Sequence, residues 1–439
     1  MTDPVKFLRD TAPYINTHRG KTFVLALSGE AVDHVNFTNI VHDIALLHSL
    51  GIKLVLVHGA KTQVEERLKS CAITAQFDQH TRITDNESMA CVKDAVGSTR
   101  ITIEAKLSTG AVNSPMHGAR IQVVGGNLIT AKPLGVKDGI DFHHTGEVRR
   151  IDQKSLQKQL DDGAIVLLSP IGYSPTGEAF NLNYEDIATH AAISVGAEKL
   201  IMFSADKGIS DQQGNLIKML SLNEVPGCLD NLNGEVALQN ALMACYQACE
   251  NSVSRGHIIS YTHNGALIEE LFTREGNGTL VLKNGANTIR QATIDDVGGL
   301  LELITPLEEQ GILVKRSREL LETEISRFSI IEHSEGMLVG CAALYPFNGG
   351  DSNSSNSAEL ACVATHPDFI NQGIASELLE HIEYLAIQQG IKKLFVLTVK
   401  AGHWFKEKGF VDSSLDDLPA ERQSLYNLQR NSHIFCKNL

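Results

Sequence analysis

Short apolar runs recur between Thr22 and Leu282, and this pattern constrains the fold more than any other feature of the chain. Runs of strand type lie at 22–27, 53–58, 120–124, 164–168, 199–203, 257–261 and 280–282. Stretches of helical periodicity separate them, for example at 41–50 and from Lys61 onward. This alternation of strand, helix and strand predicts an α/β domain, an αβα sandwich on a mostly parallel sheet.

The pattern changes after residue 283. A strand is expected at 289–293, a helix opened by Asp295 or Asp296, a second helix at 317–327, and then three strands in succession. The polar, low-complexity run at 348–357 predicts an exposed hairpin loop. We therefore expect two domains, at 1–283 and 288–439, joined by a linker at 284–287.

Charge and cysteine content exclude several classes of function. The 439 residues contain 52 Asp and Glu against 38 Lys and Arg, a net charge of -14, which argues against nucleic acid or an anionic membrane as partner. The eight cysteines are scattered without C-x-x-C pairs, so neither a disulfide framework nor a metal site is expected. The charged first residues and the lack of a long apolar stretch predict a cytoplasmic protein.

The most informative stretch runs from Ala358 to Leu379. A strand ends near Val363, His366 and Pro367 stop it, and residues 373–375 begin a helix with the small sequence Gly-Ile-Ala. Small residues at a helix N-terminus leave backbone N–H groups accessible, and the helix dipole favours an anion there, so a pyrophosphate would fit. An ordinary strand–loop–helix corner is the alternative interpretation.

This stretch resembles motif A of the GNAT acetyltransferases, in which a loop of the form Q/R-x-x-G-x-G/A binds the pyrophosphate of acetyl-CoA. The strand at 392–398 and the helix from Ala401 resemble motif B. Two positions depart from the family. Ile370 occupies a usual Gln or Arg position of the loop, and Phe405 stands where many of these enzymes have a tyrosine that protonates the leaving thiolate. The resemblance implies a C-terminal α+β GNAT domain.

The chemistry of acyl transfer names further candidates. A free amine is mostly protonated near neutral pH, so a general base is needed, and Glu359 on the strand before the loop is the candidate. A solvent-facing strand residue is the alternative interpretation of Glu359. The backbone N–H of Cys362 or Val363 is expected to stabilise the oxyanion, and Thr398 to relay a proton to the thiolate. The Cys362 side chain is expected to be a small core residue.

Two basic clusters could hold the acceptor substrate. One is the run Leu-Val-Lys-Arg-Ser-Arg at 313–318, and the other lies at 430–433. Cationic donors in pairs suit two carboxylates of one small acid. A solvated helix start and a surface strand are the alternative interpretation.

Over nearly its whole length the chain resembles the family of classical bacterial N-acetylglutamate synthases. The resemblance is carried by 13–23, 46–52, 149–152, 311–319 and 394–398. These enzymes join an amino-acid-kinase-like domain to a GNAT domain. They transfer acetyl from acetyl-CoA to the α-amine of L-glutamate, which is the first step of arginine biosynthesis. The resemblance implies the same reaction for this chain. It also implies feedback regulation by L-arginine and a homo-oligomeric ring, commonly a hexamer.

Carried over position by position, the resemblance implies a set of site residues. For L-glutamate these are Lys315, Arg316, Arg430 and Ser432, with Arg318 as a neighbour. For acetyl-CoA they are Cys362, Val363, Gln372, Gly373, Ile374 and Ala375. The family often has Arg where this chain has Lys315, but an ammonium group can still pair with a carboxylate.

The N-terminal domain lacks the signatures of a working kinase. Amino-acid kinases begin with a strand ending in K-x-G-G, whose lysine neutralises the transferred phosphoryl group, and this chain has Ala-Leu-Ser-Gly at 26–29. A second signature, N-x-N-x-D, is present as Asn-Leu-Asn-Tyr-Glu at 181–185, where Tyr184 would crowd a nucleotide. We predict that this domain is catalytically silent.

The resemblance further implies that the N-terminal domain binds L-arginine. The residues expected to form the effector site are Tyr14, Lys199, Glu269, Glu270, Gly276 and Gly278. For Glu269 and Glu270 the alternative is the exposed face of an ordinary helix. Two other hypotheses remain open for the whole chain: a non-catalytic arginine sensor, and a GNAT enzyme that acts on another small amino acid.

Overall fold

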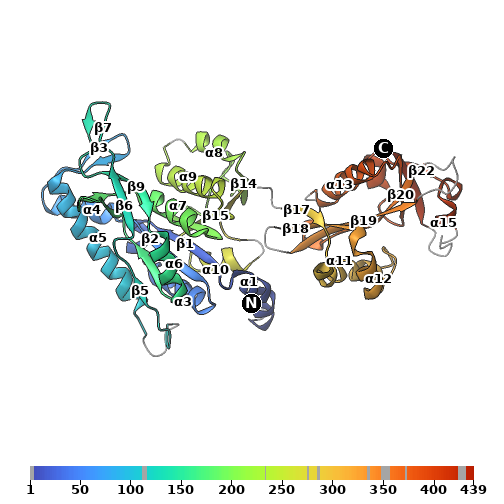
Figure 1. The fold of residues 1–439 in the computed structure, drawn as a ribbon, viewed down its shortest axis with the longest axis horizontal. Helices are drawn as coiled ribbons and strands as arrows, with labels where there is room; N and C mark the ends of the chain where they lie inside the picture. Colours follow the sequence, from blue (N-terminus) through green and yellow to red (C-terminus); the bar gives the residue numbers. More distant parts are fainter. Residues whose placement is uncertain are drawn as a thin grey trace. The chain divides into compact units, whose positions relative to one another are not determined.

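The structure is a computed structural model. It describes residues 4–110, 116–232, 234–273, 276–283, 287–333, 337–347, 356–370, 373–423 and 432–439. The chain forms two compact units, Met1–Gly285 and Ala286–Leu439, and each is described by itself (Figure 1). Within the described ranges, no helix is long and apolar enough to cross a membrane.

The first unit is built on an eight-stranded sheet of order β14-β16-β15-β13-β1-β2-β10-β5. The strands are β1 (Thr22–Leu27), β2 (Lys53–His58), β5 (Val123–Val124), β10 (Ile165–Leu168), β13 (Lys199–Ser204), β14 (Met219–Ser221), β15 (Arg255–Ser260) and β16 (Thr279–Leu282). Only β15 and β16 pair antiparallel; all other neighbours pair parallel. The predicted mostly parallel sheet is confirmed, although β5 is shorter than the predicted run at 120–124.

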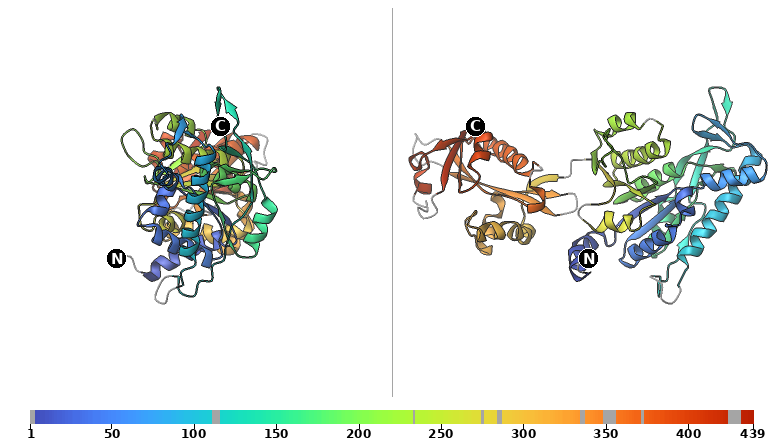
Figure 2. Two further views of the ribbon diagram at one scale, coloured as in Figure 1. Left: turned by 90° about the vertical axis from the view of Figure 1, so that its left-hand side faces the viewer. Right: turned by 180° about the vertical axis from the view of Figure 1, so that it is seen from behind.

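Helices cover both faces of this sheet (Figures 1 and 2). One face packs against α3 (Phe37–Ser49), α5 (Asn86–Leu107) and α10 (Ala266–Phe272), and the other against α6 (Gln153–Asp161), α7 (Tyr184–Val195) and α9 (Val236–Glu250). The alternation of side chains along a strand explains the two cores. Phe23 and Leu25 of β1 enter the first core, whereas Val24 and Ala26 enter the second.

Several elements of this unit lie outside the three layers. They are α1 (Pro4–His18), α2 (Gly29–Asp33), α4 (Lys61–Ser70) and α8 (Val225–Asn231), the hairpins β3 (Gln76–Asp78) with β4 (Thr81–Ile83) and β7 (Val136–Lys137) with β8 (Ile140–Asp141), and a second sheet of order β12-β11-β6-β9. The strands of that sheet are β6 (Ile129–Pro133), β9 (Gly146–Ile151), β11 (Ile171–Tyr173) and β12 (Ala179–Asn181). The sequence did not predict it, because these strands are short and only partly buried.

The second unit contains a seven-stranded sheet of order β17-β18-β19-β20-β21-β23-β22. Its strands are β17 (Asn287–Gln291), β18 (Phe328–His333), β19 (Leu338–Phe347), β20 (Ser357–Thr365), β21 (Lys393–Thr398), β22 (Val411–Ser413) and β23 (His433–Asn438). All neighbours are antiparallel except β20 and β21. The three successive strands predicted after the second helix are β18, β19 and β20.

One long helix covers one face of this sheet and two helices cover the other (Figure 1). The helix α13 (Ile374–Gln388) packs on the first face, and α11 (Val297–Glu309) and α12 (Arg318–Glu324) on the second. The predicted start of α11 is confirmed within two residues, because Asp295 and Asp296 form a 3-10 turn before it. Two short helices, α14 (Gly402–Glu407) and α15 (Ala420–Gln423), complete the described elements that position the site.

Candidate active site

The parallel strands β20 and β21 separate part-way along their length. They pair only from Ser357 to Glu359, opposite Lys393 to Phe395. Beyond that point β20 stays paired with β19 as far as Thr365, and β21 stays paired with β23 as far as Thr398. The backbone edge of β20 after Glu359 is therefore exposed toward the space between the diverging strands, where a ligand can take its hydrogen bonds.

A β-bulge lies directly beyond this separation. Cys362 and Val363 together oppose a single residue of β19, and Cys362 has a φ of 54°. The extra residue changes which way the side chains point. Val363 packs on the α13 side of the sheet, whereas Cys362 lies on the side of α11 and α12. Cys362 is buried, as predicted for a small core residue, so only its backbone is left to contact acetyl-CoA from the α13 side.

The predicted pyrophosphate site is the N-terminus of α13. Gly373 has a φ of 82° and accepts the backbone N–H groups of Ser376 and Glu377 at 2.9 and 3.0 Å. The amides of the first helical turn have no partner inside the helix and attract an anion. Ile374 is buried and anchors this end, while Ala375 is half-buried. Gln372, the remaining predicted contact in this loop, lies outside the described residues.

Glu359 faces Arg422, a residue that the sequence analysis did not single out. The Arg422 Nε and Nη2 atoms donate to the two carboxylate oxygens of Glu359 at 2.6 and 3.1 Å. The two side chains are 17% and 12% exposed, respectively. The interpretation of Glu359 as a solvent-facing residue is therefore wrong. Arg422 belongs to a short helix in a polar stretch, and no local signal in the sequence distinguishes it from an exposed charge.

Arg316 lies on the same side of the sheet as Glu359 and Cys362. Its side chain is half-buried, bonds the side chain of Tyr345 and interacts with the charge of Glu359. Tyr345 stands opposite Glu359 in the β19–β20 ladder, and its hydroxyl donates to Glu324 at 2.7 Å. Burial, with that hydrogen bond, raises the pKa of Tyr345. A guanidinium and a carboxylate thus interact near the end of the β20–β21 pairing.

The remaining predicted residues lie in different surroundings. Lys315 is exposed on the loop before α12, and Ser432 is buried just before β23, whereas Arg430 lies outside the described residues. The Thr398 hydroxyl accepts the amides of Lys400 and Ala401 at 3.3 and 3.1 Å and so holds the turn that leads into α14. That role leaves its hydroxyl proton available for the predicted relay.

Phe405 occupies the core rather than the open space. It is 3% exposed, and its ring lies 4.9 Å from that of Trp404 and 5.4 Å from that of Phe410, centroid to centroid. A hydroxyl at this position is missing from the chain, as the sequence indicates. The described residues therefore offer Thr398, and no tyrosine in α14, as a proton source near the end of β21.

In the first unit, Tyr184 packs against Gly59 near the start of α2. A β-carbon at Gly59 would lie 3.0 Å from Cδ1 of Tyr184 and 3.2 Å from the amide nitrogen of Gly29. The surroundings are acidic, because Glu30 and Glu185 both interact with Tyr184. Burial raises the pKa of Glu185 to about 7. Tyr184 thus packs closely against Gly59, among ionisable groups of both signs, because Lys61 also interacts with Glu185.

A buried charge network connects three of the predicted effector residues. Lys199 Nζ lies 3.4 Å from His257 Nε2, and His257 Nδ1 lies 2.6 Å from a carboxylate oxygen of Glu270. The other oxygen of Glu270 accepts the backbone amides of Asn277 and Gly278 at 2.6 and 2.8 Å. Because Glu270 is 5% exposed, the alternative of an exposed helix face is wrong for this residue.

The charges in this network follow from its hydrogen bonds. Burial, together with the charge of nearby Lys199, lowers the pKa of His257 to about 4. Burial raises the pKa of Glu270, but the bonds from His257, Asn277 and Gly278 outweigh it and bring the value to about 2. A neutral imidazole thus links a lysine to a carboxylate. It accepts from Lys199 and donates to Glu270.

The other predicted effector residues surround this network. The side chain of Glu269 is 47% exposed and accepts Asn277 Nδ2 at 2.6 Å. Gly276 has a φ of 61°, and a β-carbon there would lie 2.8 Å from a Glu270 oxygen. Tyr14 lies on α1, which is tied to α10 by the bond between His18 Nε2 and the Leu271 carbonyl at 3.0 Å. The structure brings these residues to the junction of α1, α10 and β15.

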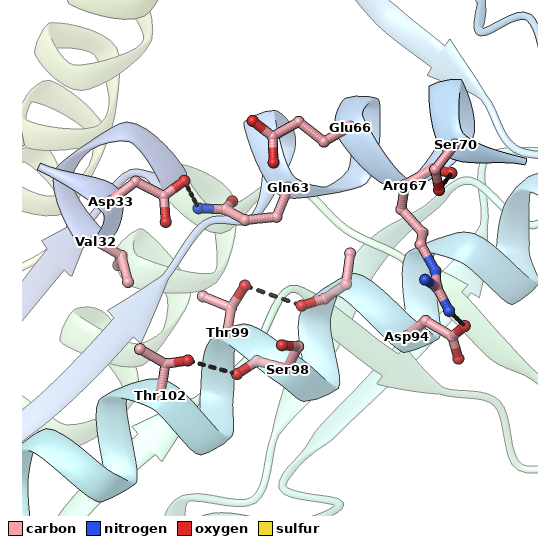
Figure 3. Close-up of a pocket in the computed structure, with 11 residues that line it drawn as sticks. Val32, Asp33, Gln63, Glu66, Arg67, Ser70, Asp94, Ser98, Thr99 and Thr102 are labelled. Carbon is pink, nitrogen blue, oxygen red and sulfur yellow. Dashed lines mark hydrogen bonds and ion pairs between the residues drawn. The ribbon is translucent and has the colours of Figure 1, made fainter.

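A hollow lies elsewhere in the first unit, between α2, α4 and α5 (Figure 3). Its volume is about 600 Å³, and none of the predicted site residues lines it. Two hydrogen-bonded pairs cross its lining. Arg67 binds Asp94 at 2.6 Å, and Gln63 donates to Asp33 at 2.6 Å.

The fold and the site define a class of protein, namely a GNAT acyltransferase joined to an amino-acid-kinase fold. Residues 21–260 match the model of the amino acid kinase family, and residues 300–410 match that of the acetyltransferase (GNAT) family. Within the described residues, no group of three or more His, Cys, Asp or Glu could hold a metal ion.

Known proteins resemble the chain over its full length. Amino-acid acetyltransferases of Ectopseudomonas mendocina and Azotobacter vinelandii are 54% and 55% identical to it, with 100% of each chain covered. Among solved structures, N-acetylglutamate synthase from Neisseria gonorrhoeae complexed with coenzyme A and L-arginine is 37% identical, with a TM-score of 0.90, and covers 100% of this chain and 99% of its own. The same enzyme complexed with coenzyme A and N-acetyl-glutamate is 38% identical, with a TM-score of 0.63 and the same coverage.

The chain therefore belongs to the amino-acid acetyltransferase family. It is an amino-acid N-acetyltransferase, and acetyl-CoA is its co-substrate. The predicted fold class, the predicted resemblance and the hypothesis of an enzyme are confirmed. The hypothesis of a non-catalytic sensor is not supported.

Proposed function

We propose that the chain acetylates the α-amine of L-glutamate to give N-acetyl-L-glutamate and CoA, as the first step of arginine biosynthesis. The observation that carries the proposal is the half-buried side chain of Arg316, which interacts with the charge of Glu359, the last residue of β20 that pairs with β21. A guanidinium recognises a carboxylate through paired hydrogen bonds, which suits an acidic acceptor. The solved relative complexed with coenzyme A and N-acetyl-glutamate supports the same acceptor.

In this proposal each residue has one role in the transfer. Glu359 accepts the proton of the attacking amine, directly or through a water. The backbone amides at the Cys362–Val363 bulge stabilise the oxyanion that forms on the thioester. The first turn of α13 holds the pyrophosphate of acetyl-CoA, and Thr398 supplies a proton to the leaving thiolate. The acceptor is held by Arg316 and Ser432, with Lys315 and Arg430 completing the predicted set.

We also propose that L-arginine regulates the enzyme through the first unit. A guanidinium ligand needs carboxylates and a wall for its aliphatic stem. Glu269 offers a half-exposed carboxylate on α10, and Tyr14 a ring on α1, which His18 ties to α10. The network of Lys199, His257 and Glu270 holds the loop at 276–278 against α10. The solved relative that contains L-arginine supports this choice of effector.

We propose further that the first unit has no phosphotransfer activity. Ala26 stands where a kinase needs a lysine, and Tyr184 packs against Gly59. Phosphoryl transfer depends on positioned positive charge, whereas Glu30 and Glu185 interact with Tyr184. We expect no ATP-dependent phosphorylation of N-acetylglutamate by the full chain. Detection of that product would contradict the proposal.

The decisive experiment measures thiol release from acetyl-CoA with a panel of amino acids. We expect L-glutamate to give a kcat/KM about ten- to 150-fold above those of L-aspartate, L-glutamine and L-lysine, since loss of one charge-assisted contact costs ~1.5–3 kcal/mol. Equal turnover of L-aspartate or L-lysine would show a broader amino-acid acetyltransferase.

The same assay, repeated with L-arginine, tests the regulation. We expect L-arginine to lower the rate with L-glutamate, and D-arginine at the same concentration serves as the control. A rate that neither compound changes would reject L-arginine as an effector and leave the acetyl transfer untouched. The two proposals can therefore fail independently.

A further inference from the structure

Two cysteines that acetyl transfer does not use meet at the bulge of β20. The Cys341 thiol lies 3.4 Å from the carbonyl oxygen of Cys362, and the two side chains also form a hydrogen bond with each other. They are 0% and 5% exposed. Of the eight cysteines in the chain, these two lie on the strands that form the candidate active site.

The bulge itself creates this pair. In regular β-structure successive side chains alternate between the two faces of a sheet. The extra residue in β20 breaks the alternation, so Cys362 enters the same core cluster as Cys341 and Ala364. Cys362 holds a φ of 54° to do this, a conformation that residues other than glycine adopt at an energetic cost. The surrounding β19–β20 ladder maintains that conformation, which places one thiol against the other.

The two thiols differ in their chemistry. The hydrogen bond from Cys341 lowers the pKa of Cys362, and the charge of Arg316 acts in the same direction against the effect of burial. The same contact and burial raise the pKa of Cys341. A thiolate is the reactive form of cysteine toward oxidants. Cys362 is thus the thiol that reacts first, and Cys341 is the one placed to react with its product.

We propose that Cys341 and Cys362 form a reversible oxidation site, in which hydrogen peroxide converts the two thiols into a disulfide and stops acetyl transfer. The Cys362 thiolate attacks peroxide, the O–O bond breaks, and the released hydroxide takes up a proton to become water. The Cys341 thiol then attacks the sulfenic sulfur, loses its proton and releases a second water. Two thiols and one peroxide thus give one disulfide and two waters.

The disulfide would act on the site through the bulge. An S–S bond is about 2.05 Å long, shorter than any contact between free thiols, so its formation draws Cys362 toward β19. That movement shifts the amides of Cys362 and Val363. Those amides are the proposed oxyanion donors, and a small displacement of such donors lowers the rate strongly. Reduction of the bond restores the original arrangement.

The test oxidises the full-length protein with hydrogen peroxide, alkylates the remaining thiols and maps the peptides by mass spectrometry. We expect a peptide pair joined through Cys341 and Cys362, lighter by two hydrogens than the reduced peptides. Acetyl transfer should fall at least about tenfold as this species accumulates, and dithiothreitol should restore it. Saturating acetyl-CoA should slow the reaction, because it covers the diverging strands.

Two variants separate this pair from other thiols. C71S removes an exposed cysteine that contacts Cys91 in the first unit, and it should lose activity with peroxide as the parent does. C341A should form no cross-link, and dimedone should label its Cys362 as a sulfenic acid. Rates are compared with those of each variant before oxidation.

Two results would overturn the proposal. One is inactive, peroxide-treated parent protein in which Cys341 and Cys362 are both alkylated as free thiols. The other is a complete Cys341–Cys362 cross-link with an unchanged rate. Peptide mapping of the parent protein gives either answer even if C341A does not fold. The result of the peptide mapping is also independent of which amino acid is the acceptor.

Discussion

The carboxylate of Glu359 is held by two charge-assisted hydrogen bonds from Arg422. Such a pair fixes the direction of both side chains, because the planar guanidinium matches the two oxygens. Arg422 thereby orients Glu359 on the strand edge where β20 leaves β21. An acidic substrate that engages Arg422 would release one oxygen of Glu359, so binding of the acceptor and availability of the base are linked at the level of single residues.

Glu359→Gln removes the proposed base and keeps the shape of the side chain. We expect kcat to fall by about 10²–10⁴-fold, the range that a general base contributes, with little change in the affinity for acetyl-CoA. Steady-state kinetics and calorimetric binding of CoA measure the two effects. The matched control is Glu383→Gln on α13, which breaks a 2.6 Å ion pair with Lys437 of β23. An unchanged kcat in Glu359→Gln would exclude Glu359 as the base.

Arg422→Lys keeps the charge and loses the paired geometry. A charge-assisted hydrogen bond contributes ~1.5–3 kcal/mol, so we expect kcat/KM for the acceptor to fall about tenfold or more, with the KM for acetyl-CoA unchanged. Arg67→Lys changes an exposed arginine that pairs with Asp94 in the first unit, and it should keep full activity. A loss confined to acetyl-CoA binding would contradict this role of Arg422.

At the scale of elements, the sequence predicts what regular periodicity encodes. The apolar runs of β1, β2, β10 and β13 are buried on both faces, so they read as continuous hydrophobic strands. The helix α13 is recognisable from its small first residues and its apolar stripe. The second sheet is not recognisable, because β11 and β12 have only three residues each.

The geometry of the site depends on features that no local pattern encodes. The bulge at Cys362 is a property of the β19–β20 register, and the pairing of Glu359 with Arg422 joins positions 63 residues apart. Its place on the strand before the loop makes Glu359 a candidate base, but nothing in the sequence indicates its partner. In the first unit, likewise, Glu270 could be called exposed from helical periodicity, whereas His257 and the 276–278 loop bury it.

Gly340 in β19 determines how closely α13 approaches the sheet. A β-carbon there would lie 2.5 Å from Cγ2 of Ile374 and 3.0 Å from Cδ1 of Leu378. In Gly340→Ala the first turn of α13 must therefore move, and overpacking of this kind costs ~1–3 kcal/mol. We expect a lower unfolding midpoint and a KM for acetyl-CoA raised about tenfold, with a smaller effect on the acceptor KM, since the pyrophosphate site moves with that turn.

The control for this variant is Gly298→Ala in α11, where an added β-carbon meets nothing within 4 Å. Alanine is the better helix former by ~1 kcal/mol, so this change should preserve or raise stability and leave both KM values unchanged. Thermal unfolding and steady-state kinetics compare the pair. If Gly340→Ala behaves like the control, the close packing of α13 on β19 does not position the acetyl-CoA site.

At the scale of the whole molecule, the two units differ in their response to acid. Burial lowers the pKa of His18, His58 and His257 in the first unit to about 3, 4 and 4, below the ordinary value of 6.5. Between pH 6.5 and about 4 the unfolded chain therefore binds protons that the folded unit does not. Stability is present above pH 6.5 and is lost as the pH falls, by ~1.4 kcal/mol per pH unit for each histidine.

Burial raises the pKa of Asp43 to about 6 and that of Glu185 to about 7, so these carboxyls take up protons in the folded unit and offset part of this loss. Because the three histidines outweigh them, we expect the first unit to unfold at a lower urea concentration at pH 5 than at pH 7. Glu270, whose pKa is about 2, extends the loss from its ordinary value of 4.5 downward. The single tryptophan, Trp404, reports on the second unit by fluorescence, while circular dichroism follows both. The dichroism transition should shift with pH more than the tryptophan transition. Coincident transitions that do not move between pH 7 and pH 5 would contradict this assignment.

The proposed effector site and the proposed catalytic site lie in different units, so any influence of one on the other must obey linkage. If L-arginine weakens binding of acetyl-CoA or L-glutamate by some factor, that ligand must weaken binding of L-arginine by the same factor. We expect calorimetric titration to give equal coupling factors in both directions, of about 5–150-fold, and Glu269→Gln to weaken L-arginine binding without lowering the rate in its absence. Glu235→Gln, at the N-terminal end of α9, is the control. L-Arginine that lowers only kcat, with no change in either affinity, would place the regulation on the chemical step, since reciprocity holds for binding and not for rates.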